Sequence, residues 1–310
     1  MKIQALQMRP FSPWLEQELQ SRYEVHRWFE ISSPDHFIAE HGQSIQVVVT
    51  GGEIGIQPEL MARLSSLRIV AINGVGFDKV DLEECRRRGV RVTTTPNVLT
   101  DDVADLAVGL AIALLRGIPG SDRHVREGHW KSAERPLAHK VTGRRFGIMG
   151  LGQIGNAIAQ RLVPFGAVGY CDVAQKQVPY QYFSAPLELA RWCDILILAT
   201  SANASTRRII GREILDALGS AGYLVNVARG SLVDEPELIR ALDGNRIAGV
   251  ALDVFEDEPN VPEALRSSPK VVLTPHIASA TIETREAMAR AVLTNLDAFF
   301  AGQHPPGTIA

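Results

Sequence analysis

The stretch Arg145–Leu162, RFGIMGLGQIGNAIAQRL, contains the pattern that decides the fold class of this chain. An apolar run typical of a strand passes through a glycine-rich turn into a helical pattern. The glycines of the turn have the G-x-G-x-x-G spacing and are Gly150, Gly152 and Gly155. In this context they permit a tight turn, the close approach of a pyrophosphate, and close packing of the helix on the strand. The alternative is a purely structural strand–helix turn.

The helix after this turn is expected to bind the pyrophosphate of a dinucleotide. The backbone N–H groups of Gln153 and Ile154 lie in its first turn, where they have no partners within the helix. The next apolar run ends at Asp172, about 20 positions after the first glycine, where a carboxylate can bind the ribose hydroxyls. Because a carboxylate there repels a 2′-phosphate, Asp172 favours NAD(H). Only Lys176 offers a nearby cation, and the alternative for Asp172 is an exposed turn.

Length and composition are those of an ordinary globular enzyme. The 310 residues are too many for one small domain and favour two. The chain is 45% hydrophobic and 22% charged, with a net charge of −3 and both signs interspersed, which argues against nucleic acid as a partner. It contains no signal-type apolar segment and no run of about 18 apolar residues, so we expect no membrane association.

Cysteine and histidine usage favours a cytoplasmic protein without a metal. The three cysteines are widely spaced, form no CxxC pair, and are interpreted as reduced, mostly buried thiols: Cys85, Cys171 and Cys193. Three histidines share one segment without a cysteine or carboxylate at ligand spacing: His124, His129 and His139. The sequence therefore predicts no metal site.

Short apolar runs alternate with helical patterns along the chain, which predicts βαβ units and parallel sheets. The expected strands are 46–50, 68–73, 91–95, 145–150, a run ending at 169–172, 194–200, 223–228, 249–255 and 271–275. The expected helices are 102–117, 155–166, 235–244 and 281–302.

Two boundaries are expected, one near Pro96 and one just after His276. Residues 1–98 and 277–310 would form a discontinuous, flavodoxin-like substrate-binding domain. Residues 99–276 would form an inserted dinucleotide-binding Rossmann domain. We therefore predict an α/β protein of two Rossmann-like, doubly wound parallel-sheet domains with an active-site cleft between them, because such a cleft is a favoured place for a small ligand.

Three titratable residues follow apolar runs and are candidates for catalysis: Arg229, Glu258 and His276. Because ligands collect at the carboxyl ends of parallel strands, all three could meet at one site. Arg229 can hold a planar carboxylate bidentately, and His276 can donate a proton near neutral pH. Glu258 would orient His276 and favour its protonated form. The set suits reduction of a carbonyl next to a carboxylate, although a surface loop or a structural histidine would also explain single members.

Four ordered motifs, GLGQIG, NVARGSLVDE, GVALDVFEDEP and TPHIASAT, resemble the D-isomer-specific 2-hydroxyacid dehydrogenase family. The resemblance extends over nearly the whole chain. The segments TPNVLTDDVADLAVGL and VPEALRSSPKVVLTPH are similar to its branch of hydroxypyruvate, glyoxylate and hydroxyphenylpyruvate reductases. The resemblance implies an oxidoreductase that reduces a small 2-oxo acid to the D-2-hydroxy acid.

The resemblance also implies roles for individual residues. The catalytic trio falls on Arg229, Glu258 and His276, and the backbone N–H groups that bind the substrate carboxylate fall on Gly74, Val75 and Gly76. Arg229 and His276 would also contact the substrate. The family places an aspartate against the nicotinamide carboxamide, which corresponds to Asp253. The cofactor contacts are completed by Val227 and Ala228.

One departure from the branch concerns the cofactor. Reductases of this branch carry a Ser-Arg type of pair after the second strand, which suits NADPH, whereas this chain has Asp172 and Val173. We follow the residues and predict NAD(H), with NADP(H) as the alternative through Lys176 or a shifted loop.

Two alternative functions are weighed against the reductase, and the sequence also bears on the oligomeric state. A dehydrogenase of another small anion, such as formate, is disfavoured because formate dehydrogenases of this type replace the glutamate that Glu258 represents. An NAD(H)-sensing, corepressor-like binding protein would need a further binding cleft or tail. The segment around Trp130 resembles a dimer interface of the family, and a surface loop is its alternative. We expect a homodimer.

Overall fold

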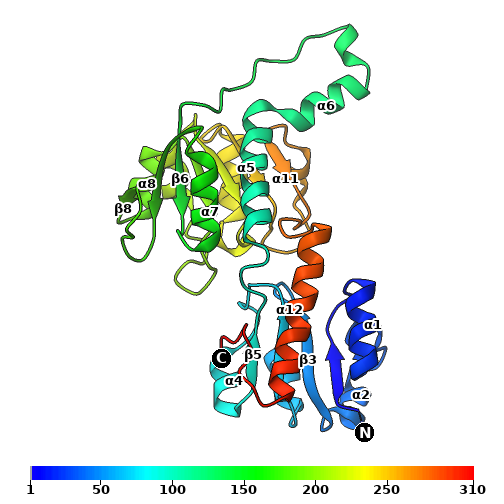
Figure 1. Ribbon diagram of the computed structural model, residues 1–310. Helices are drawn as coiled ribbons and strands as arrows, with labels where there is room; N and C mark the ends of the chain where they lie inside the picture. The colour runs from blue at the N-terminus through cyan, green and yellow to red at the C-terminus, as the bar shows by residue number, and fades with distance from the viewer. Residues whose placement is uncertain (1) are drawn as a thin grey trace. The chain divides into compact units, whose positions relative to one another are not determined.

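The computed structural model describes residues 2–310 and divides into two compact units, which are described one at a time (Figure 1). Unit 1 comprises residues 2–99 and 281–310. Unit 2 comprises residues 100–280 and contains the glycine-rich turn.

Unit 1 is built on a five-stranded, all-parallel sheet of order β2-β1-β3-β4-β5. The strands are β1 (Gln4–Gln7), β2 (Glu24–Arg27), β3 (Ile45–Gly51), β4 (Ile69–Asn73) and β5 (Arg91–Thr93). The helices are α1 (Pro13–Arg22), α2 (Pro34–His41), α3 (Pro58–Arg63), α4 (Leu82–Arg88) and α12 (Ile282–Phe300), with a 3₁₀ turn η1 (Trp28–Glu30).

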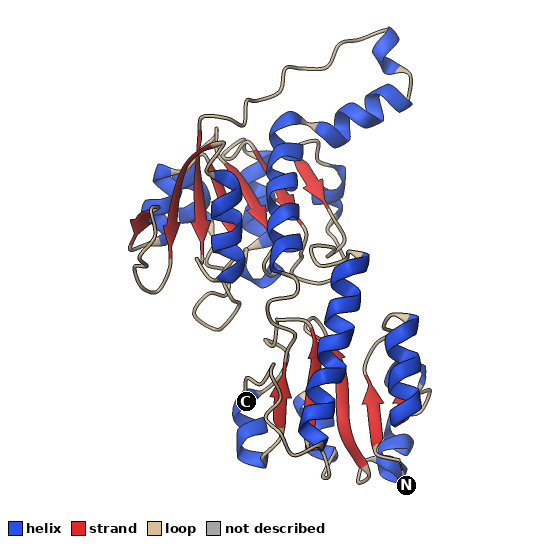
Figure 2. Ribbon diagram, in the orientation of Figure 1, coloured by secondary structure: helices blue, strands red, loops and turns tan. Residues whose placement is uncertain are grey.

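Helices cover both faces of this sheet (Figure 2). Because side chains alternate along a strand, Val47 and Val49 pack on one face with α1 and α12, whereas Val48 packs on the other with α2, α3 and α4. The end of the chain returns to β5, where Val92 exchanges backbone hydrogen bonds with Ile309 and Ala310. This pairing fixes the last residues of the chain to the first unit.

Unit 2 is built on a seven-stranded parallel sheet of order β12-β11-β10-β9-β6-β7-β8. The strands are β6 (Arg144–Met149), β7 (Gly166–Cys171), β8 (Gln181–Phe183), β9 (Ile195–Leu198), β10 (Tyr223–Asn226), β11 (Gly249–Leu252) and β12 (Val271–Leu273). The helices are α5 (Thr100–Arg116), α6 (Ile118–Arg126), α7 (Gln153–Leu162), α8 (Pro186–Trp192), α9 (Arg212–Leu218), α10 (Glu235–Asp243) and α11 (Glu263–Ser267), with 3₁₀ turns η2 (His129–Lys131) and η3 (Gly230–Leu232).

The strand order of unit 2 reverses beside β6, which pairs with β9 on one side and β7 on the other. Such a switch point leaves a crevice at the carboxyl ends of the strands, where doubly wound sheets bind their ligands. One large apolar cluster buries α8, α9 and α10 against the central strands, while α5 packs on α7 and on β10–β12. The layers of unit 2 therefore place the glycine-rich turn at this switch point.

The predicted fold class, two doubly wound parallel-sheet α/β domains, is confirmed by these sheets. The short strands β1, β2 and β8 were not predicted, because residues such as Gln7, Arg27 and Gln181 break the apolar pattern by which strands were identified. Several predicted strands end up to three residues earlier than expected. The residues past these ends leave the sheet and carry the polar groups described below.

The change from unit 2 back to unit 1 lies at residues 280 and 281. Residues up to Ala280 stay with unit 2 because the N–H groups of Ile277 and Ala278 donate to the buried carboxylate of Asp253, at 2.8 and 3.0 Å. Thr281 then caps α12 by accepting a hydrogen bond from the N–H of Thr284, a typical helix start.

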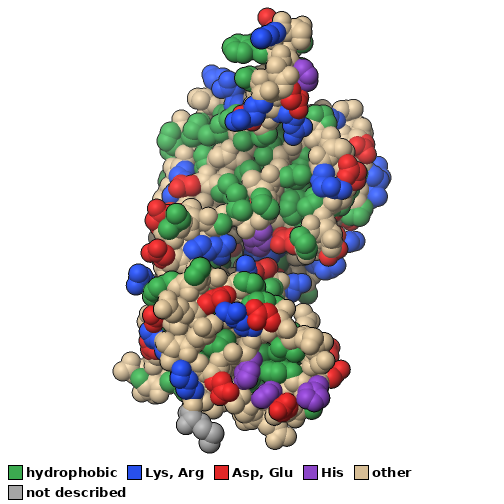
Figure 3. Space-filling view, turned by 90° about the vertical axis from the view of Figure 1, so that its right-hand side faces the viewer, with side chains coloured by type: hydrophobic (Ala, Val, Ile, Leu, Met, Phe, Trp, Pro, Cys, Tyr) green, Lys and Arg blue, Asp and Glu red, His purple; other side chains and the backbone are tan. Residues whose placement is uncertain are grey.

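Three observations bear on possible partners: a protruding segment of unit 2, the distribution of surface charge, and the length and composition of the helices. Residues 118–139 form α6, η2 and an extended segment that leaves the body of unit 2 (Figure 1). On the face shown in Figure 3, acidic and basic side chains are interspersed, without a broad field of one sign. Within residues 2–310, no single helix is long and apolar enough to cross a membrane, although the bent pair α5 and α6 passes a test of length and composition alone.

Candidate functional site

The glycine-rich turn has the shape that a bound pyrophosphate requires. Gly150 has a φ of +91°, and a Cβ atom there would lie 2.6 Å from Cα of Thr200. A Cβ atom on Gly155 would lie 2.0 Å from the carbonyl oxygen of Gly150. A Cβ atom on Gly152, by contrast, would have no heavy atom within 4 Å. Gly150 and Gly155 thus serve close packing, and the space over Gly152 fits the phosphates of a dinucleotide.

The helix that begins at this turn offers the donors for these phosphates. Gly152 is the N-cap of α7 and has no side chain to accept from the first N–H groups. Gln153 and Ile154 are the first two residues of this ten-residue helix, so their N–H groups have no partner within the helix and lie at its positive end. The turn and the helix fit a dinucleotide cofactor.

Asp172 follows β7 and lies against the glycine-rich turn. Its carboxylate accepts from the N–H of Leu151 at 2.8 Å and from its neighbour Val173 at 2.7 Å, and it forms an ion pair with Lys176 at 2.9 Å. Burial alone would raise the pKa of Asp172, but Lys176 and the two N–H groups outweigh it and hold the pKa below its usual range. The Lys176 ammonium also donates to the carbonyl of Leu151, so its charge is already paired.

Arg229 lies just past the end of β10, held there by its neighbours. Buried Asn226 accepts from the N–H of Ala228 at 3.0 Å and donates to the Arg229 carbonyl at 2.9 Å, which closes the turn at the strand end. A Cβ atom on Gly230 would lie 1.9 Å from the carbonyl carbon of Phe255. Only glycine permits this approach, and it brings the Arg229 backbone against the loop that carries Glu258.

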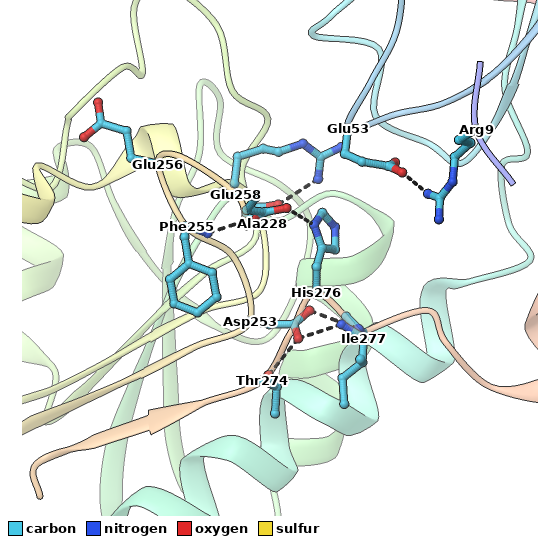
Figure 4. Close-up of polar contacts among 12 residues, drawn as sticks. Arg9, Glu53, Ala228, Asp253, Phe255, Glu256, Glu258, Thr274, His276 and Ile277 are labelled. Atoms are coloured by element: carbon cyan, nitrogen blue, oxygen red, sulfur yellow. Dashed lines mark hydrogen bonds and ion pairs between the residues drawn. The ribbon is translucent and has the colours of Figure 1, made fainter. Parts of the chain in front are cut away.

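Glu258 and His276 form a direct pair (Figure 4). Oε2 of Glu258 lies 2.7 Å from Nδ1 of His276, and Oε1 accepts from the N–H of Phe255 at 3.0 Å. Burial acts to raise the pKa of Glu258, but the bond to His276 and the charges of His276 and Arg229 outweigh it, so the pKa lies below its usual range. Glu258 is therefore an anion at neutral pH, and it fixes the orientation of the imidazole.

Asp253 follows β11 and organises the loop of His276. It is completely buried and accepts from the Thr274 hydroxyl at 2.7 Å as well as from Ile277 and Ala278 (Figure 4). Its carbonyl accepts from the N–H of His276 at 2.8 Å, which supports the left-handed backbone of that residue, φ 53°. Burial raises the pKa of Asp253, despite its three donors.

The segment Gly74–Gly76 belongs to unit 1 and follows β4. Gly74 has a φ of +159°, and its carbonyl accepts from the N–H of Thr95 at 2.8 Å. A Cβ atom on Gly52 would lie 2.6 Å from the carbonyl oxygen of Gly76, so the two loops pack backbone to backbone. The segment lies at the carboxyl edge of its own sheet, the edge where open parallel sheets bind their ligands.

In unit 2, the structure brings Arg229, Glu258 and His276 into one electrostatic group, with Asp253 behind His276. Val227 and Ala228 lie in the turn between Asn226 and Arg229. Sequence reasoning missed Asn226 and Thr274, which position the group without carrying a charge; their only signal is a polar residue directly after an apolar run. Within residues 2–310, no group of three or more histidine, cysteine, aspartate or glutamate side chains could hold a metal ion.

Comparison with known families gives one match over more than half of the chain. The model "D-isomer specific 2-hydroxyacid dehydrogenase, NAD binding domain" matches residues 108–278. The matched region contains the glycine-rich turn, Asp172 and all three candidate catalytic residues.

Relatives of known function cover nearly all of the chain. The glyoxylate/hydroxypyruvate reductase A of Arabidopsis thaliana is 45% identical over 303 residues, 97% of both chains. The 2-ketogluconate reductase of Gluconobacter oxydans is 42% identical over 301 residues, 96% of both chains. Among solved structures, an NADPH-dependent glyoxylate/hydroxypyruvate reductase of Sinorhizobium meliloti in complex with NADP and malonate is 38% identical, with a TM-score of 0.95 over 100% of this chain and 97% of that one.

Proposed function

This chain belongs to the D-isomer-specific 2-hydroxyacid dehydrogenase family, and we propose that it reduces small 2-oxo acids of the glyoxylate and hydroxypyruvate type to D-2-hydroxy acids. The reaction consumes one NAD(P)H and one proton per carbonyl reduced. The observation that carries the proposal is the 2.7 Å pair of Glu258 and His276 beside the charge of Arg229, at the edge of the sheet where the glycine-rich turn lies. The relatives are reductases, which does not favour a corepressor-like sensor.

Each residue has a role in the proposed reaction. When bound, the nicotinamide would supply the hydride, and Asp253, Val227 and Ala228 would be the residues that hold it. His276 donates the proton to the carbonyl oxygen, and Glu258 stabilises and orients its acid form. Arg229 binds the substrate and the negative charge that develops on that oxygen. The N–H groups of the segment Gly74–Gly76 bind the substrate carboxylate.

We propose NADH as the preferred cofactor, with NADPH as the alternative. Asp172 is ionised, since its pKa is held low, and a second anion such as a 2′-phosphate would be repelled. Lys176, the one nearby cation considered for that phosphate, is already paired with Asp172. A solved structure of an NADPH-dependent relative is the reason to keep NADPH as the alternative.

The first test measures the loss of reduced-nicotinamide absorbance with NADH and NADPH in parallel, using glyoxylate, hydroxypyruvate, pyruvate and phenylpyruvate. We expect turnover with glyoxylate or hydroxypyruvate, and a kcat/KM at least tenfold higher with NADH, about 1.4 kcal/mol in favour of the unphosphorylated ribose. Binding of NADH without turnover of any 2-oxo acid would contradict the enzymatic proposal.

The variant Asp172→Ser separates the carboxylate from the rest of the cofactor site. The change removes the repulsion and releases Lys176, so the NADH:NADPH ratio should fall at least tenfold. An unchanged ratio would mean that Asp172 does not select the cofactor, whichever cofactor the wild type prefers.

We further propose that the protein is a cytoplasmic homodimer, with no nucleic-acid partner, in which a second copy covers residues 118–139. Three apolar side chains of this segment are exposed: Val125 by 55%, Trp130 by 71% and Leu137 by 98%. Such a concentration of exposed apolar surface is unusual for a monomer. The three cysteines are free and buried, which suits a reducing compartment.

The dimer is tested with the double variant Trp130→Ser/Leu137→Ser. Because a buried interface tryptophan typically contributes about 2 kcal/mol or more, the dimer dissociation constant should rise about 30-fold or more. Sedimentation equilibrium measures it, with Val163→Ser, a change at another exposed apolar residue, as the matched control. A double variant that dimerises as tightly as this control would show that the segment is not the interface.

A further inference from the structure

Three charged side chains of unit 1 gather where its strands end. Arg9 follows β1, Glu53 follows β3, and Arg285 lies in the first turns of α12. Arg9 and Glu53 form an ion pair and point toward each other (Figure 4). Burial, and then the charge of nearby Arg285, lower the pKa of Arg9. The cluster therefore holds two positive charges and one negative charge, and the one carboxylate is paired with Arg9.

Arg285 occupies an unfavourable position for a cation. It is half-buried near the N-terminus of α12, the positive end of the helix, where a positive charge is destabilising. Within residues 2–310, its guanidinium has no hydrogen bond or ion pair, and burial lowers its pKa. A desolvated guanidinium without a partner costs free energy unless an anion meets it. The position of Arg285 therefore indicates that an anionic ligand binds next to it.

The cluster lies next to the segment proposed to bind the substrate carboxylate. A Cβ atom on Gly51 would lie 2.6 Å from both carboxylate oxygens of Glu53, so this side chain folds back over the end of β3. Gly52, between them, packs on the carbonyl of Gly76. Because β1, β3 and β4 are neighbours in the sheet, the charged cluster and the Gly74–Gly76 segment share one edge of unit 1.

We propose that Arg9 and Arg285, balanced by Glu53, form a subsite for a second anionic group of the substrate, so that the preferred substrates include 2-oxo dicarboxylic acids. The inference rests on the proposed function, because the 2-oxo acid end is held as described there. Two guanidinium groups and one carboxylate leave a net charge of +1, which one distal carboxylate neutralises. A guanidinium also binds a carboxylate through two parallel hydrogen bonds. An aromatic distal group would leave Arg285 desolvated and unpaired and the excess positive charge unbalanced.

The test compares kcat/KM for oxaloacetate and 2-oxoglutarate with that for phenylpyruvate and glyoxylate. We expect at least one dicarboxylate to exceed phenylpyruvate by tenfold or more. The variants Arg9→Met and Arg285→Met should each raise the KM for the dicarboxylate about tenfold or more, and much more than the KM for glyoxylate. Arg285→Lys should recover part of this loss, and Glu53→Gln should lower the KM for the dicarboxylate, since it removes the competing anion.

Arg22→Met is the matched control, because Arg22 pairs with Glu18 and Asp297 on the exposed surface of the same unit. It should leave the ratio of the two KM values unchanged. Reduction of glyoxylate with no preference for either dicarboxylate over phenylpyruvate would overturn the subsite and leave the proposed function standing. Equal losses with both substrate types in Arg9→Met and Arg285→Met would also overturn it, by assigning the arginines a structural role. Failure to reduce any 2-oxo acid would instead reject the proposed function.

Discussion

Replacing His276 with asparagine should lower kcat for 2-oxo acid reduction by about 10²–10⁴-fold, the contribution typical of one general acid. Asparagine retains a polar group of similar size, but it cannot donate a proton to the carbonyl oxygen. The backbone of this residue is held by Asp253 rather than by its side chain, so the loop should keep its shape. Rapid mixing with NADH measures the chemical step, and quenching of protein fluorescence measures NADH binding.

The dissociation constant for NADH should change less than threefold in His276→Asn. A collapse of NADH binding would show that His276 is structural, and near-normal turnover would show that another group is the acid. Glu258→Gln serves as the comparison, because it removes the anion while keeping a hydrogen-bonding group beside the imidazole. It should cost less activity than His276→Asn, since the proton donor itself remains.

The pH dependence of the protein's stability follows in part from Glu258. Its pKa lies below the ordinary value of a glutamate, near 4.5, so the carboxylate stays charged from about pH 5 upward. A group with a lowered pKa contributes stability that is present at neutral pH and is lost as the pH falls through the folded-state pKa. The stability difference between wild type and Glu258→Gln, measured by urea unfolding, should therefore shrink as the pH falls below about 4.5.

Much of the fold and of the candidate site could be predicted because the informative residues are close together in the sequence. The strand, turn and helix around Gly150 are one continuous stretch, and Arg229, Asp253 and His276 each follow an apolar run by a few residues. Parallel strands end at one edge, so such residues are expected to converge without knowledge of the exact packing. Local pattern and sheet topology were sufficient for the fold class, whereas the role of Asp253 was implied only by the family resemblance.

Contacts between distant residues could not be predicted in this way. The close approach of Gly230 to Phe255 depends on how two loops pack, and a glycine in a turn carries no sign of it. The charge of Arg285 acts on Arg9 because α12 returns to the first unit, which the spacing of charges in the sequence does not reveal. Lys176 was expected only as a nearby cation, whereas its ion pair with Asp172 requires the loop after β7 to fold back.

Replacing Arg229 with lysine should lower kcat/KM by about 10²–10³-fold, as expected when a preorganised donor to a developing oxyanion is lost. Lysine keeps the charge but cannot form two parallel hydrogen bonds with a planar carboxylate. Because Arg229 is proposed to bind both the ground state and the charge that develops on the carbonyl oxygen, KM should rise and kcat should fall together. Steady-state kinetics with glyoxylate and hydroxypyruvate give both parameters.

Arg207→Lys is the matched control, because Arg207 lies in the same unit, is exposed, and pairs with Glu256 rather than with the candidate site. Its kinetics should match those of the wild type. A rise in KM alone in Arg229→Lys would limit Arg229 to substrate binding, and the charge of the transition state would then need another donor. Unchanged kinetics would remove Arg229 from the site. Because Glu258 owes part of its low pKa to the charge of Arg229, lysine should preserve the Glu258–His276 pair and isolate the geometric contribution of the guanidinium.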